Sequence, residues 1–199
     1  MSADGSPPPA HPDRLRWNAR YAGGFTPSFR PHPLAVRALT MDLPGGPVAD
    51  LACGASGSAL LAASEGRRVT AVDISELALG LLGDEARRRG LENLITVVHA
   101  DLAARPLPPR SHALVLCTGW WDRATFAGSA DAVTPGGLLG WEAFTAAARR
   151  TRSDLSPDWC LDPGEPGSLL PADFTVLDQH DLPERGRRQL LARRQQASQ

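Results

Sequence analysis

Acidic side chains lie at the ends of apolar segments that are typical of buried strands. Asp73 and Asp101 each follow such a segment, and Asp50 lies in another, just before a glycine-bearing turn at residues 53–57. A carboxylate at a strand end can accept hydrogen bonds from both hydroxyls of a ribose. Glycine in the turn lets the backbone approach a ligand closely. These residue types therefore predict a site for an adenosine-containing ligand.

The elements that position these acids begin with residues 47–75, which predict a strand, a tight turn, a helix and a second strand. Asp73 ends the second strand, about twenty residues beyond the turn, as in βαβ units that hold a nucleoside. A nicotinamide-dependent oxidoreductase would share this design. Its turn normally carries G-x-G-x-x-G, however, and Gly54 and Gly57 do not supply that spacing. The oxidoreductase is therefore the weaker alternative.

Helical and strand-like segments alternate along most of the chain, and the strands are nearly continuous apolar runs. This alternation indicates a parallel sheet covered by helices on both faces. We expect Asp13 to cap the first helix, and Pro135–Gly137 to form a turn before the fifth strand. The expected strands cover residues 48–52, 67–72, 94–99, 112–117 and 138–144, with a closing pair at 174–177 and 188–192, and the expected helices cover 13–21, 33–41, 58–66, 75–89 and 122–133.

The length of 199 residues suffices for one well-buried core and is short for two. We therefore expect a single domain at residues 13–194, with a disordered tail at 1–12 and a frayed end at 195–199. Within that domain, residues 13–43 are expected to form a helical lid over the ligand site.

Composition and charge argue against several classes of protein. The formal net charge of −1 gives no bulk attraction to nucleic acid or to an anionic membrane, and no apolar run approaches the length of a membrane span. Cys53, Cys117 and Cys160 lie far apart, which argues against a disulfide framework and a structural metal site. The N-terminus lacks a signal-peptide pattern. We expect a cytoplasmic, reduced protein with neither nucleic acid nor membrane as partner.

Five short motifs occur in order along the chain. They are Trp17-Asn18-Ala19-Arg20-Tyr21, Asp50-Leu51-Ala52-Cys53-Gly54, Val72-Asp73-Ile74-Ser75, Ala100-Asp101-Leu102 and Thr134-Pro135-Gly136-Gly137-Leu138-Leu139. Together they resemble the class I S-adenosylmethionine-dependent methyltransferases. The first is similar to the W-x-x-R-Y segment of small methyltransferases related to thiopurine and tellurite-resistance enzymes. The resemblance implies a Rossmann-like, doubly wound α/β fold in three α/β/α layers, mostly parallel with an antiparallel C-terminal strand.

The resemblance also implies that the ligand is S-adenosyl-L-methionine, with S-adenosylhomocysteine as the product. This cofactor has no pyrophosphate, so the turn does not need the full G-x-G-x-x-G pattern. Asp73 is expected to accept from the ribose hydroxyls, Asp101 from the adenine amino group, and Asp50 from the α-ammonium group, directly or through water. The expected cofactor-binding residues are Asp50, Ala52, Cys53, Gly54, Ser56, Asp73, Ile74, Asp101, Leu102, Cys117 and Thr118.

Ser56 is the residue at which the turn departs from the family's pattern, because a third glycine usually stands there. A serine costs little in a tight turn if its φ angle stays negative. The departure leaves open whether the cofactor is bound with ordinary affinity. It also keeps open the alternative of a non-catalytic or degenerate cofactor-binding protein of the same fold.

Two segments are expected to surround the methyl acceptor. The resemblance places acceptor-facing residues directly after the fourth strand, and the N-terminal helix can cover the pocket. The loop that contains Trp159 is a further candidate for the opposite wall. Aromatic and arginine side chains here allow a small planar or anionic molecule. The expected acceptor-binding residues are Trp17, Arg20, Tyr21, Trp120, Trp121 and Arg123.

The expected reaction is the in-line displacement of a methyl group from the sulfonium to a small-molecule acceptor. A base is required only if the acceptor must lose a proton, and Asp122, His32 and His99 are the candidates. A soft nucleophile such as a thiol would need none, so we assign no catalytic residue. The chain is expected to act as a monomer or a homodimer.

Overall fold

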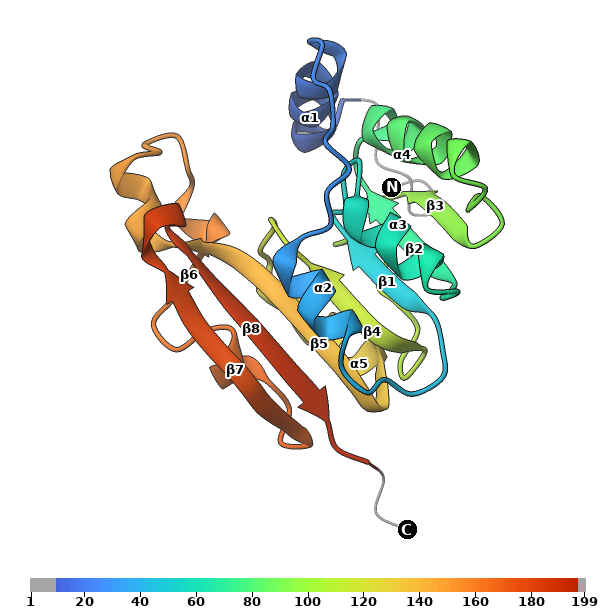
Figure 1. The fold of residues 1–199 in the computed structure, drawn as a ribbon. Coiled ribbons are helices and arrows are strands. Elements are labelled where there is room, and N and C mark those ends of the chain that lie inside the picture. The colour runs from blue at the N-terminus through green and yellow to red at the C-terminus, as the bar shows by residue number, and fades with distance from the viewer. Residues whose placement is uncertain (1–9, 197–199) are drawn as a thin grey trace.

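Eight strands form one mixed sheet within residues 10–196, the part of the chain that the computed structural model describes (Figure 1). The expected tails lie partly outside this part, at positions 1–9 and 197–199. The strand order is β3-β2-β1-β4-β5-β8-β7, and the short β6 pairs with β5. The strands are β1 (Val48–Leu51), β2 (Val69–Asp73), β3 (Ile95–His99), β4 (His112–Cys117), β5 (Val133–Thr145), β6 (Cys160–Leu161), β7 (Phe174–Leu182) and β8 (Arg187–Arg194).

The sheet is parallel from β3 to β5 and antiparallel beyond β5. β1 pairs in parallel with both β2 and β4, and β4 pairs in parallel with β5, whereas β8 runs antiparallel to β5 and to β7. The strand order reverses between β1 and β4, which are neighbours in space but not in sequence. In open α/β sheets, ligands bind at the carboxyl ends of the strands beside such a switch point. The expected mostly parallel α/β fold is confirmed.

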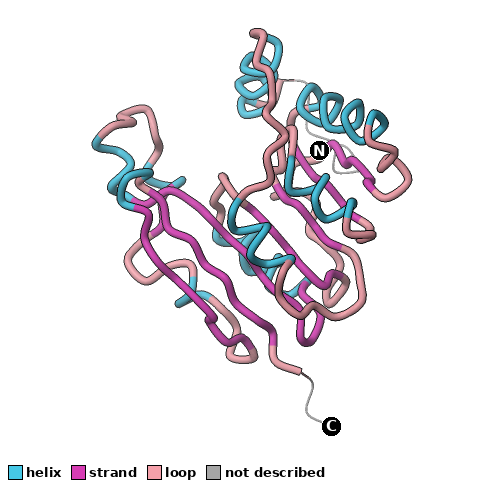
Figure 2. Tube along the Cα trace, in the orientation of Figure 1, coloured by secondary structure: helices cyan, strands magenta, loops and turns pink. Residues whose placement is uncertain are grey.

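Helices cover both faces of the sheet (Figure 2). Leu60 of α3 and Leu82 of α4 share an apolar cluster with Val48 of β1, and α2 packs into the same cluster. The next strand residue, Ala49, belongs with Phe126 of α5 to a second cluster. Because successive strand residues point to opposite faces, α5 covers the other side. The helices are α1 (Pro12–Ala22), α2 (Pro33–Leu39), α3 (Gly57–Ser64), α4 (Glu76–Arg88) and α5 (Arg123–Ala132).

Short 3₁₀ helices fill the connections that follow β5. They are η1 (Ala146–Arg150), η2 (Pro157–Trp159), η3 (Gly167–Leu169) and η4 (Pro183–Arg185). Among residues 10–196, no helix is both long enough and apolar enough to cross a membrane.

The fifth strand begins earlier than expected, because Pro135–Gly137 lies inside it as a bulge. His112 pairs with Val133 and Leu114 pairs with Leu138, so a single residue of β4 faces four of β5. An extra stretch of chain in one strand bends the strand locally and strengthens its twist. The turn was placed correctly, but it interrupts the strand rather than preceding it.

Three further features differ from expectation. Asp13 is not the cap of α1: the helix follows His11, whose side chain accepts from the Asp13 N–H. The two-residue strand β6 was not predicted, because so short a segment has no period to recognise. The closing strands reach residues 182 and 194, since the polar residues toward their ends hid the extended conformation.

Gly57→Ala tests how closely the segment before α2 packs against α3. A Cβ at Gly57 would lie 2.4 Å from the Phe29 carbonyl oxygen and 2.4 Å from the Arg30 carbonyl carbon, and neither backbone atom can move freely. We expect the substitution to lower the free energy of unfolding by about 1–3 kcal/mol, as overpacking does. Urea denaturation measures the change.

Gly80→Ala is the matched control, because Gly80 lies in the interior of α4 and a Cβ there would meet no other atom within 4 Å. It should raise the free energy of unfolding by about 0.5–1 kcal/mol through helix propensity. If Gly57→Ala raised the free energy of unfolding as Gly80→Ala is expected to do, the close packing at Gly57 would be contradicted.

Candidate functional site

A cavity of about 320 Å³ lies at the carboxyl ends of β1, β2 and β4, beside the switch point. Its walls come from α1, from the loops after the first four strands, and from β5, β8 and the η1–η2 segment. Of the residues expected at the site, those that line the cavity are Trp17, Tyr21, Ala52, Cys53, Gly54, Asp73, Ile74, Asp101, Leu102, Thr118, Trp120 and Trp121. Arg20, Asp50, Ser56, Cys117 and Arg123 lie behind or beside this lining.

The Asp73 carboxylate joins the two loops that border the cavity. The Gly54 N–H donates to its Oδ2 at 2.7 Å, and the Ser75 N–H donates to its Oδ1 at 2.8 Å. Burial raises the pKa of Asp73, and these N–H groups oppose the rise. Each carboxylate oxygen has a further lone pair. Because Asp73 also lines the cavity, it can accept hydrogen bonds from a ligand there.

The turn after β1 is held in left-handed backbone conformations. Ala52 has a φ of 47° and Gly54 a φ of 59°. Glycine adopts this region without strain, whereas alanine costs about 1–2 kcal/mol there. Ala52 is thus a second position, after Ser56, at which the turn departs from the family's glycine pattern. We did not expect this departure from the sequence. A Cβ on Gly54 would lie 2.5 Å from the Tyr21 hydroxyl, so only glycine leaves room beneath α1.

Ser56 has a structural role that explains its place in the turn. Its φ is −79°, so the backbone is unstrained, and its Oγ accepts from the Ser58 and Ala59 N–H groups as the N-cap of α3. Its hydroxyl donates to Asp50 Oδ2 at 2.5 Å. Asp50 is only 2% exposed, so it supports the turn from the side away from the cavity.

Helix α1 lies over the cavity and is held mainly by polar contacts. No residue of the helix is buried. Arg14 forms a two-point ion pair with Glu76 at the start of α4, and the Ser75 hydroxyl donates to Asn18 at 2.7 Å. Trp17 and Tyr21 line the cavity, whereas the Arg20 guanidinium lies 5.1 Å from the centre of the Phe25 ring. The helix therefore closes the site without forming part of the core.

The two tryptophans after β4 differ in their surroundings. Trp121 is 3% exposed and packs edge-on against Trp141, in a cluster with Phe126. Trp120 is half-buried, and its carbonyl accepts from the Trp141 indole N–H at 3.1 Å. Both line the cavity, and the carbonyl contact fixes the loop that carries them. Arg123, in contrast, pairs with Glu165 at 2.7 Å.

Three arginines that were not expected at the site line the cavity: Arg16, Arg152 and Arg187. Trp159 and Phe144 line it beside them, and Trp159 lies in the loop that was expected as the opposite wall. Arg16 directly precedes Trp17 in α1, and this neighbour in the sequence could have identified it. Arg187 gave no such signal, because only the antiparallel pairing of β8 with β5 brings it to the site.

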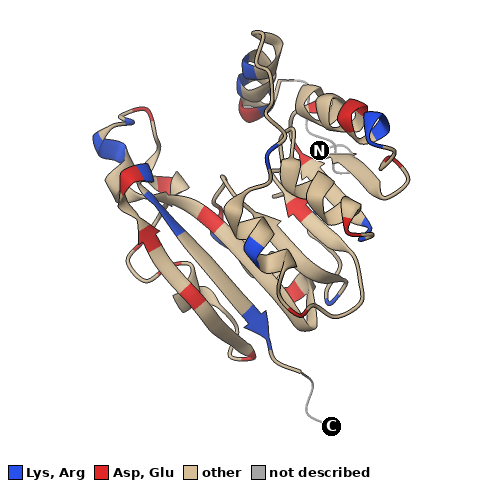
Figure 3. Cartoon of the chain, in the orientation of Figure 1, with Lys and Arg blue, Asp and Glu red and all other residues tan. Residues whose placement is uncertain are grey.

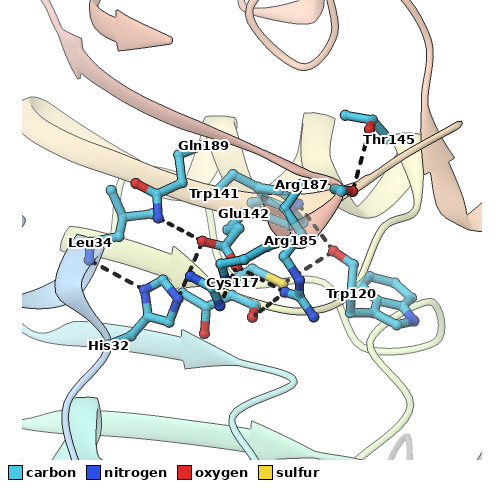
Figure 4. Close-up of polar contacts among 12 residues, drawn as sticks. His32, Leu34, Cys117, Trp120, Trp141, Glu142, Thr145, Arg185, Arg187 and Gln189 are labelled. Carbon is cyan, nitrogen blue, oxygen red and sulfur yellow. Dashed lines mark hydrogen bonds and ion pairs between the residues drawn. The ribbon is translucent and has the colours of Figure 1, made fainter. Parts of the chain in front are cut away.

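A buried carboxylate lies beneath the arginine side of the cavity (Figure 4). Glu142 on β5 has a fully buried side chain. It accepts from Arg187 at 2.9 Å and from the Gln189 amide at 2.6 Å, and Arg185 lies 3.3 Å away. His32 Nδ1 accepts from the Leu34 N–H, so the proton is on Nε2, 3.3 Å from Glu142. Burial works to raise the pKa of Glu142, but these donors and charges hold it at about 2.

The three candidate bases do not line the cavity. Asp122 caps α5 by accepting from the Thr125 N–H, and His99 contacts the Ile74 carbonyl and Glu76. His32 lies between α2 and Glu142, behind the turn. Each therefore has a structural partner away from the ligand space.

Residues 48–137 match a family model described as a methyltransferase domain. This segment of 90 of the 199 residues has the sequence pattern of a methyltransferase domain. The match begins at β1 and ends within β5, so it contains Asp73, Asp101 and the glycine turn that follows β1. No curated protein matches the chain in sequence.

Solved structures of low sequence identity share the fold of this methyltransferase domain. The geranyl diphosphate C-methyltransferase from Streptomyces coelicolor A3(2) aligns with a TM-score of 0.71 at 13% identity, over 95% of this chain and 100% of that one. An S-adenosylmethionine-dependent methyltransferase from Mesorhizobium loti aligns with a TM-score of 0.64 at 19% identity, over 80% and 96%. A structure described for the conversion of a disulfide bond into a thioacetal group in echinomycin biosynthesis aligns with a TM-score of 0.68 at 20% identity, over 94% of each chain. The fold is that of class I methyltransferases.

Asp50→Asn tests the buried acid beneath the turn of the methyltransferase domain. Burial raises the pKa of Asp50 from 3.8 to about 6. Because the folded state holds this proton more tightly, the contribution of Asp50 to stability is complete below about pH 4 and is lost as the pH rises through the folded pKa. The free energy of unfolding of the variant minus that of the wild type should increase by about 2–3 kcal/mol from about pH 4 to about pH 7.5.

Urea denaturation across this pH range measures the difference. Asp42→Asn, which removes an exposed carboxylate, is the control for the loss of one negative charge. A difference for Asp50→Asn that stays constant with pH would show that Asp50 does not titrate in this range.

Proposed function

We propose that the chain transfers a methyl group from S-adenosylmethionine to a small-molecule acceptor by in-line displacement. The proposal rests on one observation: Asp73, Asp101 and the Gly54 turn line the same cavity. That cavity continues to Trp120 and to the arginines Arg16, Arg152 and Arg187. The matched family supplies the reaction class, and the cavity extends from the acidic side chains to the arginines, so one space borders both groups of residues.

The residues of the cavity fit the cofactor in their chemistry. Asp73 can accept from a ribose diol, and Asp101 can accept from the adenine amino group. Ile74 and Leu102 supply apolar surface at the same end of the cavity. Gly54 has no side chain where Tyr21 covers the turn, so Tyr21, which lines the cavity, can lie directly against the backbone of the turn. The cofactor supplies an electrophilic methyl group on a sulfonium.

The protein's contribution to the reaction is proposed to be alignment. The three candidate bases lie outside the cavity lining, so the acceptor atom is proposed to attack without one of them. Holding two reactants in line can lower a barrier by several kcal/mol. Helix α1, with Trp17 and Tyr21 over the ligand space, is proposed as the lid of a single domain that extends from residue 13 to residue 194.

Ser56 no longer favours the degenerate-site alternative. It caps α3 and supports the turn, so its presence is compatible with an intact site. We further propose a cytoplasmic enzyme that acts as a monomer or homodimer without nucleic acid or membrane as partner. The support is that Cys53, Cys117 and Cys160 are all free, as is usual in reducing compartments.

Asp73→Ala should weaken S-adenosylhomocysteine binding by about 1.5–3 kcal/mol, since two charge-assisted hydrogen bonds to the ribose would be lost. Isothermal titration calorimetry measures the affinity. Asp84→Ala removes an exposed acid of α4 and is the matched control. Circular dichroism checks that the Asp73 variant remains folded, because its carboxylate also supports the turn.

The same titration with NAD in place of S-adenosylhomocysteine separates the alternatives. The proposal expects S-adenosylhomocysteine alone to bind. Binding of NAD alone would indicate the oxidoreductase, and binding of neither would indicate a scaffold. An unchanged affinity for S-adenosylhomocysteine in a folded Asp73→Ala variant would show that Asp73 does not bind the ribose.

A further inference from the structure

The two sides of the cavity carry opposite charge. Asp73 and Asp101 lie at the ends of β2 and β3, whereas Arg152 follows η1 and Arg187 begins β8. Figure 3 shows basic residues on the segment after β5 and on β8. In the strand order, β2 and β8 are four steps apart, which corresponds to about 19 Å at the usual strand spacing. The acids and the arginines therefore serve different parts of the ligand space.

Arg187 is held in one position by the protein. Its side chain is 18% exposed, and one nitrogen donates both to Glu142 at 2.9 Å and to the Thr118 carbonyl at 3.2 Å. The guanidinium lies 4.0 Å from the centre of the Phe144 ring. These contacts place a rigid cation at the carboxyl end of β4, where the acceptor-facing loop begins.

Neutralising the buried Glu142 carboxylate does not by itself explain Arg187, because Glu142 has other partners. Arg185 lies 3.3 Å from the same carboxylate, and Gln189 donates a further hydrogen bond. Two guanidinium groups thus share one carboxylate, and the cluster keeps a net positive charge. Burial lowers the pKa of Arg187, which shows that the protonated form is poorly solvated there. An anion in the cavity would relieve that cost.

Arg152 and Arg16 add two more cations that lack a close carboxylate partner. Arg152 stacks over Phe144 at 4.7 Å, and its nearest acid is the exposed Asp154 at 3.9 Å. Arg16 lies 4.6 Å from the Trp159 ring centre and takes part in none of the ion pairs found within residues 10–196. A guanidinium stacked on a ring by its face keeps its N–H edge available for oxygen atoms.

We propose that the methyl acceptor is an anion, with a carboxylate or phosphate group on a planar body. The anionic group binds Arg187 and Arg152, and Arg16 closes over it from α1. Trp120 and Trp159 supply flat walls for the body, and Phe144 holds the two guanidinium groups that lie over its ring. Arginine suits this role because its planar donor pairs match the oxygens of carboxylate and phosphate groups. The inference rests on the proposed function, since it assigns the acceptor side of the same cavity.

A paired-ligand screen tests the charge preference on the full chain saturated with S-adenosylhomocysteine. The probes are 4-hydroxybenzoate against 4-hydroxybenzamide, indole-3-acetate against indole-3-acetamide, and phenyl phosphate against phenol. We expect at least one anion to raise the Tm by about 2 °C or more, and its neutral partner to raise it by clearly less, as selective binding to the folded state requires. Equal or greater shifts from the neutral partners, or no shift from any anion, would overturn the inference.

The substitution Arg152→Gln tests whether this arginine binds the anionic group of the ligand. It should raise the Kd of the anion with the largest Tm shift by at least about fivefold, the scale of one charged hydrogen bond. The affinity for S-adenosylhomocysteine should stay unchanged. Arg150→Gln, in the adjacent η1 helix and outside the cavity, is the matched control and should change neither. If Arg152→Gln weakens S-adenosylhomocysteine instead, the arginines bind the cofactor carboxylate, and the inference is wrong.

A double variant, Glu142→Gln with Arg187→Gln, removes both charges of the buried pair together, so that neither is left buried without the other. It should also lose the anion preference, whereas Arg193→Gln, on the same strand β8 but outside the cavity, should keep it. Retention of the preference in the folded double variant would contradict the role of Arg187. Failure of the wild type to bind S-adenosylhomocysteine would overturn the proposed function and this inference with it. Intact cofactor binding without a preference for anions overturns this inference alone.

Discussion

The contact between Asp73 and the backbone of the turn is the interaction on which the site depends. One carboxylate accepts from Gly54 after β1 and from Ser75 after β2, and so fixes the separation of the two loops. Ser75 then caps α4 through its Oγ and donates its hydroxyl to Asn18 of α1. A continuous set of hydrogen bonds therefore links the turn, the strand-end acid and the helix that covers them. The left-handed Ala52 persists because this network holds the turn on both sides.

The acidic side of the cavity, with Asp73 and Asp101, could be predicted because its signals are local. Asp73 and Asp101 each follow an apolar run, and the carboxyl ends of parallel strands meet at one edge of a sheet. Their convergence therefore needs only the fold class, which alternation of strands and helices indicates. Helix caps are local signals of the same kind, since Ser75 and Asp122 each lie next to the helix that they cap, although the cap of α1 was placed at Asp13 instead of His11.

The arginine side could not be predicted because it depends on pairing between distant segments. Arg187 meets Thr118 only because β8 inserts between β5 and β7 in the antiparallel direction, which no local pattern specifies. The charged residues of β8 gave no apolar period at its start, so Arg187 was left outside the expected strand. Arg20 was expected at the site instead, but Phe25, just beyond the end of α1, draws its guanidinium away.

The segment that matches the family model contains the acidic side of the cavity, and the arginine side lies outside that segment. Residues 48–137 contain both cofactor-side acids and the turn, whereas Arg16, Arg152 and Arg187 all lie outside the matched segment. The matched half holds its loops mainly through backbone N–H groups, which constrain the chain to a common geometry. The other half is built from side chains that pack on aromatic rings and on a buried carboxylate, and these can change without disturbing the turn. A fold of this kind can therefore keep one side of its site while the other side diverges, and in the proposed function the three arginines belong to the side that is free to diverge.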